Sequence, residues 1–213
     1  GVGNFGVFPN PNLKPESSWN AEIGIKQGLK LGGVMGYLDI AGFWQEYQNT
    51  IEYMFGIWDS ITPQTMASGA GFMFLNTGES RVVGLDASFS GAANLSKKSQ
   101  LTFLLGYNYI VPTTLTPDYE YAQDSVGRVF SYNTTSLDPK QKVLKYRFLH
   151  NVKLDAEYTY NKKFSFGMSG KYFSKIVNMD AIIEDFEQTT IDVDILQDLR
   201  YMDYYNAHRF GNW

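Results

Sequence analysis

The stretch that decides the fold reads YRFLHNVKLDAEYTY and covers residues 146–160. Taken in steps of two, one set of its side chains is mostly aliphatic or aromatic: Tyr146, Phe148, His150, Val152, Leu154, Ala156, Tyr158 and Tyr160. The intervening set is mostly polar or charged: Arg147, Leu149, Asn151, Lys153, Asp155, Glu157 and Thr159. A helix would scatter both sets around its surface, whereas successive side chains of a β-strand point to opposite faces. The pattern therefore predicts a strand between an apolar and a polar environment.

Five further segments repeat this alternation, at residues 19–31, 34–51, 83–95, 101–109 and 164–176. The second of them is less regular, and we expect its register to slip near Gly42. We expect the six strands to have about 13 to 18 residues, longer in one case than the nine residues of clear alternation at 101–109. Strands of soluble proteins usually have about 5 or 6. Strands of the expected length suit the wall of a transmembrane barrel, which is tilted and extends beyond the bilayer.

The predicted connections alternate in length along the chain. Short turns are expected at residues 32–33, 94–99 and 161–163, and long connections at about 49–71, 112–143 and 178–212. Outer-membrane barrels have this sidedness, with short periplasmic turns and long extracellular loops. Six strands are too few to enclose a polar lumen, and open sheet edges in lipid would leave amides unpaired. We therefore expect residues 1–213 to be one partial antiparallel barrel domain of about six to seven strands, in which Trp213 begins the seventh.

The composition excludes several other classes of protein. Aromatic residues make up 16% of the 213 residues, a bias that favours strands over helices. The longest apolar runs, such as residues 31–38, are much shorter than the roughly 18 residues of a membrane-spanning helix. The chain has no Cys, so disulfides and thiolate sites are excluded. A net charge of -4 with scattered Lys and Arg provides no surface for a nucleic acid.

Two segments carry a family resemblance. Residues 10–28, NPNLKPESSWNAEIGIKQG, resemble the Asn-Pro-x-Leu-Lys-Pro-Glu segment that leads into a barrel strand of TonB-dependent outer-membrane receptors. Residues 74–91, FLNTGESRVVGLDASFSG, resemble the later Asn-x-Gly-(x)n-Gly-(Glu/Asp) strand of the same receptors, in matching order and spacing. The two motifs cover roughly the first 95 residues. The first motif and the Tyr-rich second loop are similar to those of receptors from Bacteroidota.

The resemblance implies an active transporter in the outer membrane of a Gram-negative bacterium. Such receptors take up a nutrient (iron chelate, vitamin, glycan or peptide) with energy delivered by TonB, and they carry a plug domain that is absent from this sequence. The implied partners are the plug, the remaining barrel strands, TonB through the missing N-terminal part, outer-membrane lipid and lipopolysaccharide. Pairing with a surface lipoprotein stays open, as does the substrate.

Other function classes remain as alternatives. A passive porin or an adhesin would share the barrel pattern, as would an outer-membrane barrel hydrolase of the protease or lipase type. A soluble β-sandwich or lipocalin-like binder would share the alternation but fold without detergent. No G-x-S-x-G, H-E-x-x-H or phosphate-loop motif occurs, so we expect no enzyme, no metal and no cofactor.

Aromatic residues of the long loops are the candidate ligand-binding residues, because aromatic faces bind sugars, peptides and chelates with little loss of entropy. They are Tyr53, Phe55 and Trp58 in the first loop, Tyr119, Tyr121, Phe130 and Tyr132 in the second, and Tyr201, Tyr204 and Tyr205 in the third. Aromatic residues also pack loops together, and the sequence does not decide between the two roles.

Three further groups have expected places. Aromatic girdles at the membrane interfaces would contain Trp19, Tyr37, Trp44, Tyr107, Tyr109, Tyr158, Tyr160 and Tyr172. Charged residues that face the lumen and contact a plug, or only keep the interior wet, would be Glu22, Lys26, Lys30, Lys153, Asp155 and Glu157. The acidic third loop, residues 179–211, reads as a solvated loop with a short helix rather than as a cation site, since it lacks calcium-loop spacing.

Overall fold

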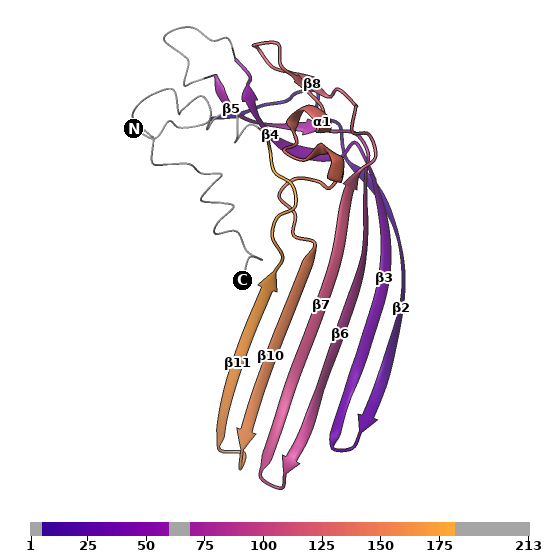
Figure 1. Ribbon diagram of the computed structural model, residues 1–213, viewed down its shortest axis with the longest axis vertical. Helices are drawn as coiled ribbons and strands as arrows, with labels where there is room; N and C mark the ends of the chain where they lie inside the picture. Colours follow the sequence, from indigo (N-terminus) through magenta and orange to yellow (C-terminus); the bar gives the residue numbers. More distant parts are fainter. Residues whose placement is uncertain (1–5, 60–68, 182–213) are drawn as a thin grey trace, which may run out of the picture.

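A computed structural model describes residues 6–59 and 69–181. Six long strands form one antiparallel sheet in the order β11-β10-β7-β6-β3-β2. Their bounds are β2 Ser17–Leu31, β3 Val34–Gln48, β6 Ser80–Ser96, β7 Ser99–Thr114, β10 His150–Tyr160 and β11 Phe164–Phe173. Figure 1 shows these strands side by side as a curved sheet along the long axis of the molecule. The structure confirms the predicted all-β class and shows part of a barrel wall that the described strands leave open.

Short turns join the strands at one end of this sheet (Figure 1). The β2–β3 turn places Gly32 at a φ of 59°, a left-handed conformation that glycine adopts without steric cost. The β6–β7 turn follows a register shift between Asn94 and Ser96, and the β10–β11 turn contains Asn161 and Lys162 at positive φ. All three predicted short turns are confirmed.

The register aligns the apolar side chains of all six strands on one face. One row across the sheet contains Ile25, Ile40, Ala87, Tyr107, Val152 and Tyr172. The adjacent row belongs to the opposite face and contains Lys26, Asp39, Ser88, Gly106, Lys153 and Lys171. Because the alternation of each strand agrees with that of its neighbour, the sheet has one apolar surface and one polar surface.

Charged side chains follow this division. On the polar face, Lys26 pairs with Asp39 at 3.2 Å and Lys153 with Asp155 at 2.7 Å. On the apolar face of the six described strands, the charged residues are Glu46 and Arg81, which pair with each other near the end opposite the short turns. In the described part of the chain, no helix is long and apolar enough to span a membrane.

Several sequence-based boundaries were wrong. The register of β3 with β2 and with β6 runs without interruption through Gly42, so the expected slip is absent. The fifth strand begins at His150, because Tyr146 has a φ of 60° and breaks the extended backbone. β11 ends at Phe173, so the six strands have 10 to 17 residues rather than 13 to 18.

One predicted girdle residue lies on the wrong face. Tyr37 is opposite Gly28 and Ser90, which belong to the polar surface. The other predicted girdle residues lie on the apolar surface, where Tyr158 and Tyr160 flank the short-turn end and Trp19 and Trp44 lie toward the opposite end.

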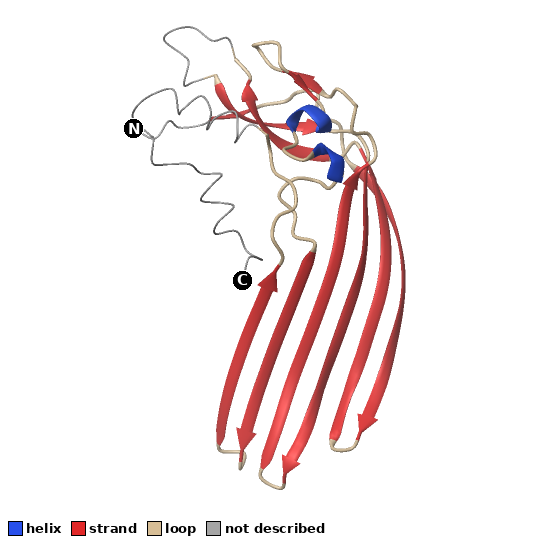
Figure 2. Cartoon of the chain, viewed as in Figure 1, coloured by secondary structure: helices blue, strands red, loops and turns tan. Residues whose placement is uncertain are grey.

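The long connections gather into a small folded unit at the other end of the sheet, which we call the loop cap (Figure 2). It contains β1 Gly6–Phe8, β4 Ile51–Ile57, β5 Ala70–Asn76, β8 Ala122–Gln123, β9 Val129–Phe130, helix α1 Tyr132–Thr135 and the 3-10 turn η1 Pro139–Gln141. The predicted connection 49–71 thus contains β4 and the start of β5, which pair as a hairpin, and β1 adds to β5 in parallel. Most of the third connection lies outside the described residues, with its expected helix and Trp213.

Adjacent leucines on opposite faces test this assignment. Leu105 lies on the apolar face and Leu104 on the polar face of the same strand. Leu105→Arg should reduce the free energy of unfolding from lipid vesicles by about 2–4 kcal/mol, since an exposed charge would face hydrocarbon. Leu104→Arg should reduce the free energy of unfolding much less. Equal losses of unfolding free energy in the two variants, measured by urea titration, would contradict a lipid-facing apolar surface.

Candidate functional site

The β4–β5 hairpin carries four aromatic side chains on one face. Tyr53 is opposite Phe74 and Phe55 is opposite Phe72 in the antiparallel register. The Tyr53 and Phe72 rings stack at 4.5 Å with an interplanar angle of 5°, and the Tyr53 and Phe74 centroids are 4.8 Å apart. Tyr53 is 43% and Phe74 46% exposed, so this aromatic surface is open to a ligand.

The opposite face of the hairpin forms the core of the loop cap. Met54 and Leu75 are buried there against Phe130, which is 1% exposed. Trp58 packs on Phe130 with ring centroids 5.1 Å apart, and its indole nitrogen donates to the carbonyl of Gly71 at 3.1 Å. This apolar core holds the hairpin against the second loop and fixes the position of the aromatic surface.

The structure separates the predicted loop aromatics into two groups. Tyr53 and Phe55 lie on the aromatic surface, and Tyr119 is 51% exposed elsewhere on the second loop. The second group points into the cap and consists of Trp58, Tyr121, Phe130 and Tyr132. Tyr201, Tyr204 and Tyr205 lie outside the described residues, and ligand binding by any of these side chains stays a prediction.

Sequence reasoning missed Phe72 and Phe74, which complete the aromatic surface. The alternation of Phe72, Phe74 and Asn76 against Met73 and Leu75 was the available signal. The hairpin was not predicted because residues 49–71 were expected to form a long loop. A strand of seven residues is short compared with the strands of the barrel wall.

Beneath the hairpin, the loop cap contains a buried polar cluster around Lys145. The Lys145 ammonium lies 3.6 Å from the Asp180 carboxylate, and the two side chains are 4% and 8% exposed. The ammonium also donates to Thr135 Oγ1 at 2.9 Å and lies 3.5 Å from Met54 Sδ. Asp180 was expected in a solvated acidic loop, and for this residue the expectation was wrong because the carboxylate is buried against a cation.

Burial shifts the titration of this cluster. Desolvation lowers the pKa of Lys145 below its ordinary value, an effect that the nearby charges of Asp180 and Glu52 oppose. Desolvation also raises the pKa of Glu52, against the attraction of Lys145 and Arg147. The pKa of the Tyr121 hydroxyl is raised by burial, so this side chain stays neutral. Glu52 is therefore the carboxyl group of the cluster that burial pushes toward its protonated form.

The cluster joins all three long connections. Met54, in contact with the Lys145 ammonium, belongs to the first connection and Thr135 to the second. Lys145 follows the second connection directly, and its partner Asp180 belongs to the third. Asn178 adds a second link, since its amide donates to the Tyr132 hydroxyl at 2.7 Å and to the Val143 carbonyl at 2.9 Å. Separate loops are thus held as one body by buried hydrogen bonds and an ion pair.

Within residues 6–59 and 69–181, no group of three or more His, Cys, Asp or Glu side chains is arranged to hold a metal ion. His150 Nδ1 is 2.9 Å from the Tyr107 hydroxyl, and its ring stacks on Tyr109 at 4.8 Å. This histidine therefore belongs to an aromatic cluster at the end of the apolar face.

Loss of the buried cation should loosen the loop cap. Lys145→Met leaves the Asp180 carboxylate without this ammonium, and removal of one partner from a buried pair typically costs about 3–5 kcal/mol. We expect faster proteolysis of the cap in the folded protein, with the barrel wall intact. Lys140→Met, at an exposed position in the same cap, is the matched control. Similar cleavage of the two variants would contradict the structural role of Lys145.

The raised pKa of Glu52 predicts a pH effect. In the window above pH 4.5 the folded cap holds a proton at Glu52 that the unfolded cap releases, so cap stability falls as pH rises. Glu52→Gln should remove this fall, whereas Glu79→Gln, at an exposed position, should retain it. Hydrogen exchange of residues 51–57 at pH 4.5 and 8, corrected for intrinsic rates, measures the difference. The same pH dependence in both variants would refute the assignment.

Comparison with known proteins identifies the family. The model of the family "TonB dependent receptor-like, beta-barrel" matches residues 1–208. No curated protein and no solved structure matches the chain. The family consists of outer-membrane receptors and transporters of Gram-negative bacteria and is not a family of enzymes. A sheet with one apolar and one polar face, and a match over nearly the whole sequence, show that this chain belongs to the TonB-dependent receptor-like β-barrel family.

Proposed function

We propose that the chain is a single segment of barrel wall, residues 1–213, in a transporter that takes up a nutrient with energy delivered by TonB. The observation that carries this proposal is the register, which aligns the apolar residues of six long strands on one face. Other strands of the receptor close the barrel around a plug domain. The apolar face contacts lipid and lipopolysaccharide, and the polar face surrounds the plug.

The outer membrane holds no ion gradient or nucleotide supply, so the force for uptake is delivered mechanically from the inner membrane. TonB reaches the plug and not this segment. The contribution of the segment is a rigid wall, a wet inner face and a capture surface. Charges on the inner face that are not in the Lys26–Asp39 or Lys153–Asp155 pairs, such as Glu22 and Lys30, contact the plug.

We propose the aromatic surface of Tyr53, Phe55, Phe72 and Phe74 as the place where the loop cap meets the nutrient. Stacked and tilted rings present flat, rigid apolar area that loses little entropy when a ligand binds. The buried core and the Lys145 cluster beneath it hold the rings in position before binding. A ligand with a flat apolar face, such as a sugar ring, an aromatic chelate or a peptide side chain, would match this surface.

Uptake measurements test the transport proposal. A strain that lacks the receptor should lose high-affinity uptake of one nutrient when iron chelates, vitamins, glycans and peptides are compared. A strain that lacks TonB should lose the same uptake. Uptake that persists without TonB would establish a passive porin, and unchanged uptake of every nutrient with reduced surface attachment would establish an adhesin. Either result overturns the proposal.

Loop variants test the capture surface in the same assay. Tyr53→Ala combined with Phe74→Ala should raise the nutrient concentration for half-maximal uptake about tenfold, since lost stacking of roughly 1.4 kcal/mol gives that factor. Maximal uptake and the amount of receptor in the membrane should not change. Val126→Ala, at an exposed position of the second loop that is not a predicted ligand-binding residue, is the control. An unchanged half-maximal concentration in the double variant would place capture elsewhere.

A further inference from the structure

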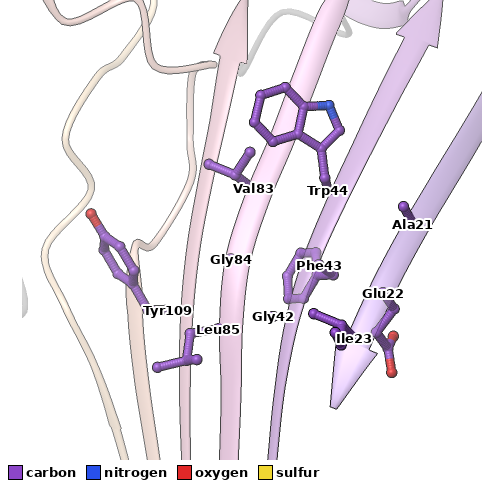
Figure 3. Close-up of a pocket in the computed structure, with 10 residues that line it drawn as sticks. All are labelled: Ala21, Glu22, Ile23, Gly42, Phe43, Trp44, Val83, Gly84, Leu85 and Tyr109. Atoms are coloured by element: carbon purple, nitrogen blue, oxygen red, sulfur yellow. The ribbon is translucent and has the colours of Figure 1, made fainter.

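The apolar face of the wall has a hollow above Gly42. In the sheet register, Ile23, Gly42 and Leu85 occupy one row, and Ala21, Trp44 and Val83 occupy the next row toward the loop cap. Gly42 has no side chain, so the larger neighbours form the walls of a shallow apolar groove, which Tyr109 bounds on the β7 side (Figure 3). The groove lies on the apolar surface, where it meets the hydrocarbon of a bilayer.

An ion pair lies directly beyond the groove. The row after Trp44 and Val83 contains Glu46 and Arg81, the charged residues of the apolar face in the described strands. Ten residue steps of β6 lead from Val83 to Ala93 at the short-turn end. At about 3.3 Å per residue and a tilt near 40°, this stretch spans about 25 Å, the usual height of the apolar band of a barrel. Arg81 therefore lies at the outer boundary of the hydrocarbon, at the level of lipid headgroups.

The arrangement around Arg81 leaves it able to bind an anion. Glu46 Oε1 accepts from Arg81 Nε at 2.9 Å, from Arg81 Nη2 at 2.6 Å and from Trp44 Nε1 at 3.2 Å. Three donors thus converge on one carboxylate oxygen. Two of them, Nε and Nη2, belong to one edge of the Arg81 guanidinium. The Trp44 ring supports the guanidinium from below at 4.3 Å. Arg81 is held in a fixed position at the mouth of the groove, and its side chain is 34% exposed.

We propose that this groove is a binding site for one phosphorylated, acylated lipid of the outer leaflet, of the lipid A type. One acyl chain lies over Gly42 between Ile23 and Leu85, and a headgroup phosphate accepts hydrogen bonds from Arg81. A flexible chain fills a hollow that rigid neighbours cannot. Arg81 uses Nε and Nη2 to bind Glu46, and the other N–H groups of its guanidinium remain to donate to a phosphate. The inference rests on the membrane location in the proposed function.

Filling the groove tests the acyl chain. A Cβ on Gly42 would meet only the Gly84 carbonyl, at 3.9 Å, so Gly42→Leu adds side-chain volume without a backbone clash. Gly170→Leu is the matched control, because Gly170 lies on the same apolar face and a Cβ there has no neighbour within 4 Å. With the full receptor in detergent and lipid A as the probe, native mass spectrometry counts retained lipid. Gly42→Leu should lower retention at least tenfold, and Gly170→Leu should not change it.

Two charge variants test the phosphate. Lipid A and the same lipid without its phosphates are compared on each receptor. Arg81→Gln should weaken retention of lipid A about tenfold and leave the phosphate-free lipid unchanged. Glu46→Gln also breaks the ion pair but keeps the cation, so it should retain lipid A at least as well as the parent. Equal loss in both charge variants would show that only the ion pair matters and overturn the phosphate contact.

These measurements distinguish failure of the lipid site from failure of the proposed membrane location. If Gly42→Leu and the parent retain equal lipid A while Leu105→Arg is far more costly than Leu104→Arg, the lipid site is wrong and the membrane wall stands. If the two leucine variants are equally tolerated, the membrane location itself fails.

Discussion

Backbone hydrogen bonding between neighbouring strands is the constraint on which this structure depends. In a bilayer an unpaired N–H or C=O group costs several kcal/mol, so a strand can cross only when both neighbours satisfy its backbone. β3 meets this condition with a continuous register to β2 on one side and to β6 on the other. Since the side-chain period is two, the same register fixes which residues lie on the apolar face. A shift by one residue would turn Lys26 and Asp39 outward, so pairing and polarity must agree on every strand.

That agreement explains what the sequence could predict. Residues 19–31, 83–95 and 164–173 alternate cleanly, and strands occur there with the expected faces. The pattern failed where local backbone geometry ended the strand, since the alternation of residues 146–149 continues past the left-handed Tyr146. Gly42 was misread for a different reason. A glycine in a strand often marks a bulge, but here it keeps the register and leaves a hollow on the apolar face.

The loop cap was much less predictable. Composition alone identified the aromatic residues, but whether a ring is exposed depends on pairing between distant segments. Tyr53 became a surface residue and Phe130 a core residue because β4 and β5 form a hairpin that covers the second loop. No short motif indicated the Lys145–Asp180 pair, whose members are 35 residues apart and meet only after the loops fold. Such contacts arise from tertiary packing, which strand periodicity does not encode.

The cap and the wall also place different demands on the same chain. The described strands carry no charged side chain on their apolar face between the Glu46–Arg81 pair and the short turns, whereas the cap buries Lys145 and Asp180 together. A buried ion pair adds little net stability compared with apolar packing, but its geometry is specific, since each partner left alone would be costly. In the cap this specificity holds three loops in one arrangement. The capture of a dilute ligand that we propose for this surface would gain from that, because loops ordered before binding lose less entropy when the ligand arrives.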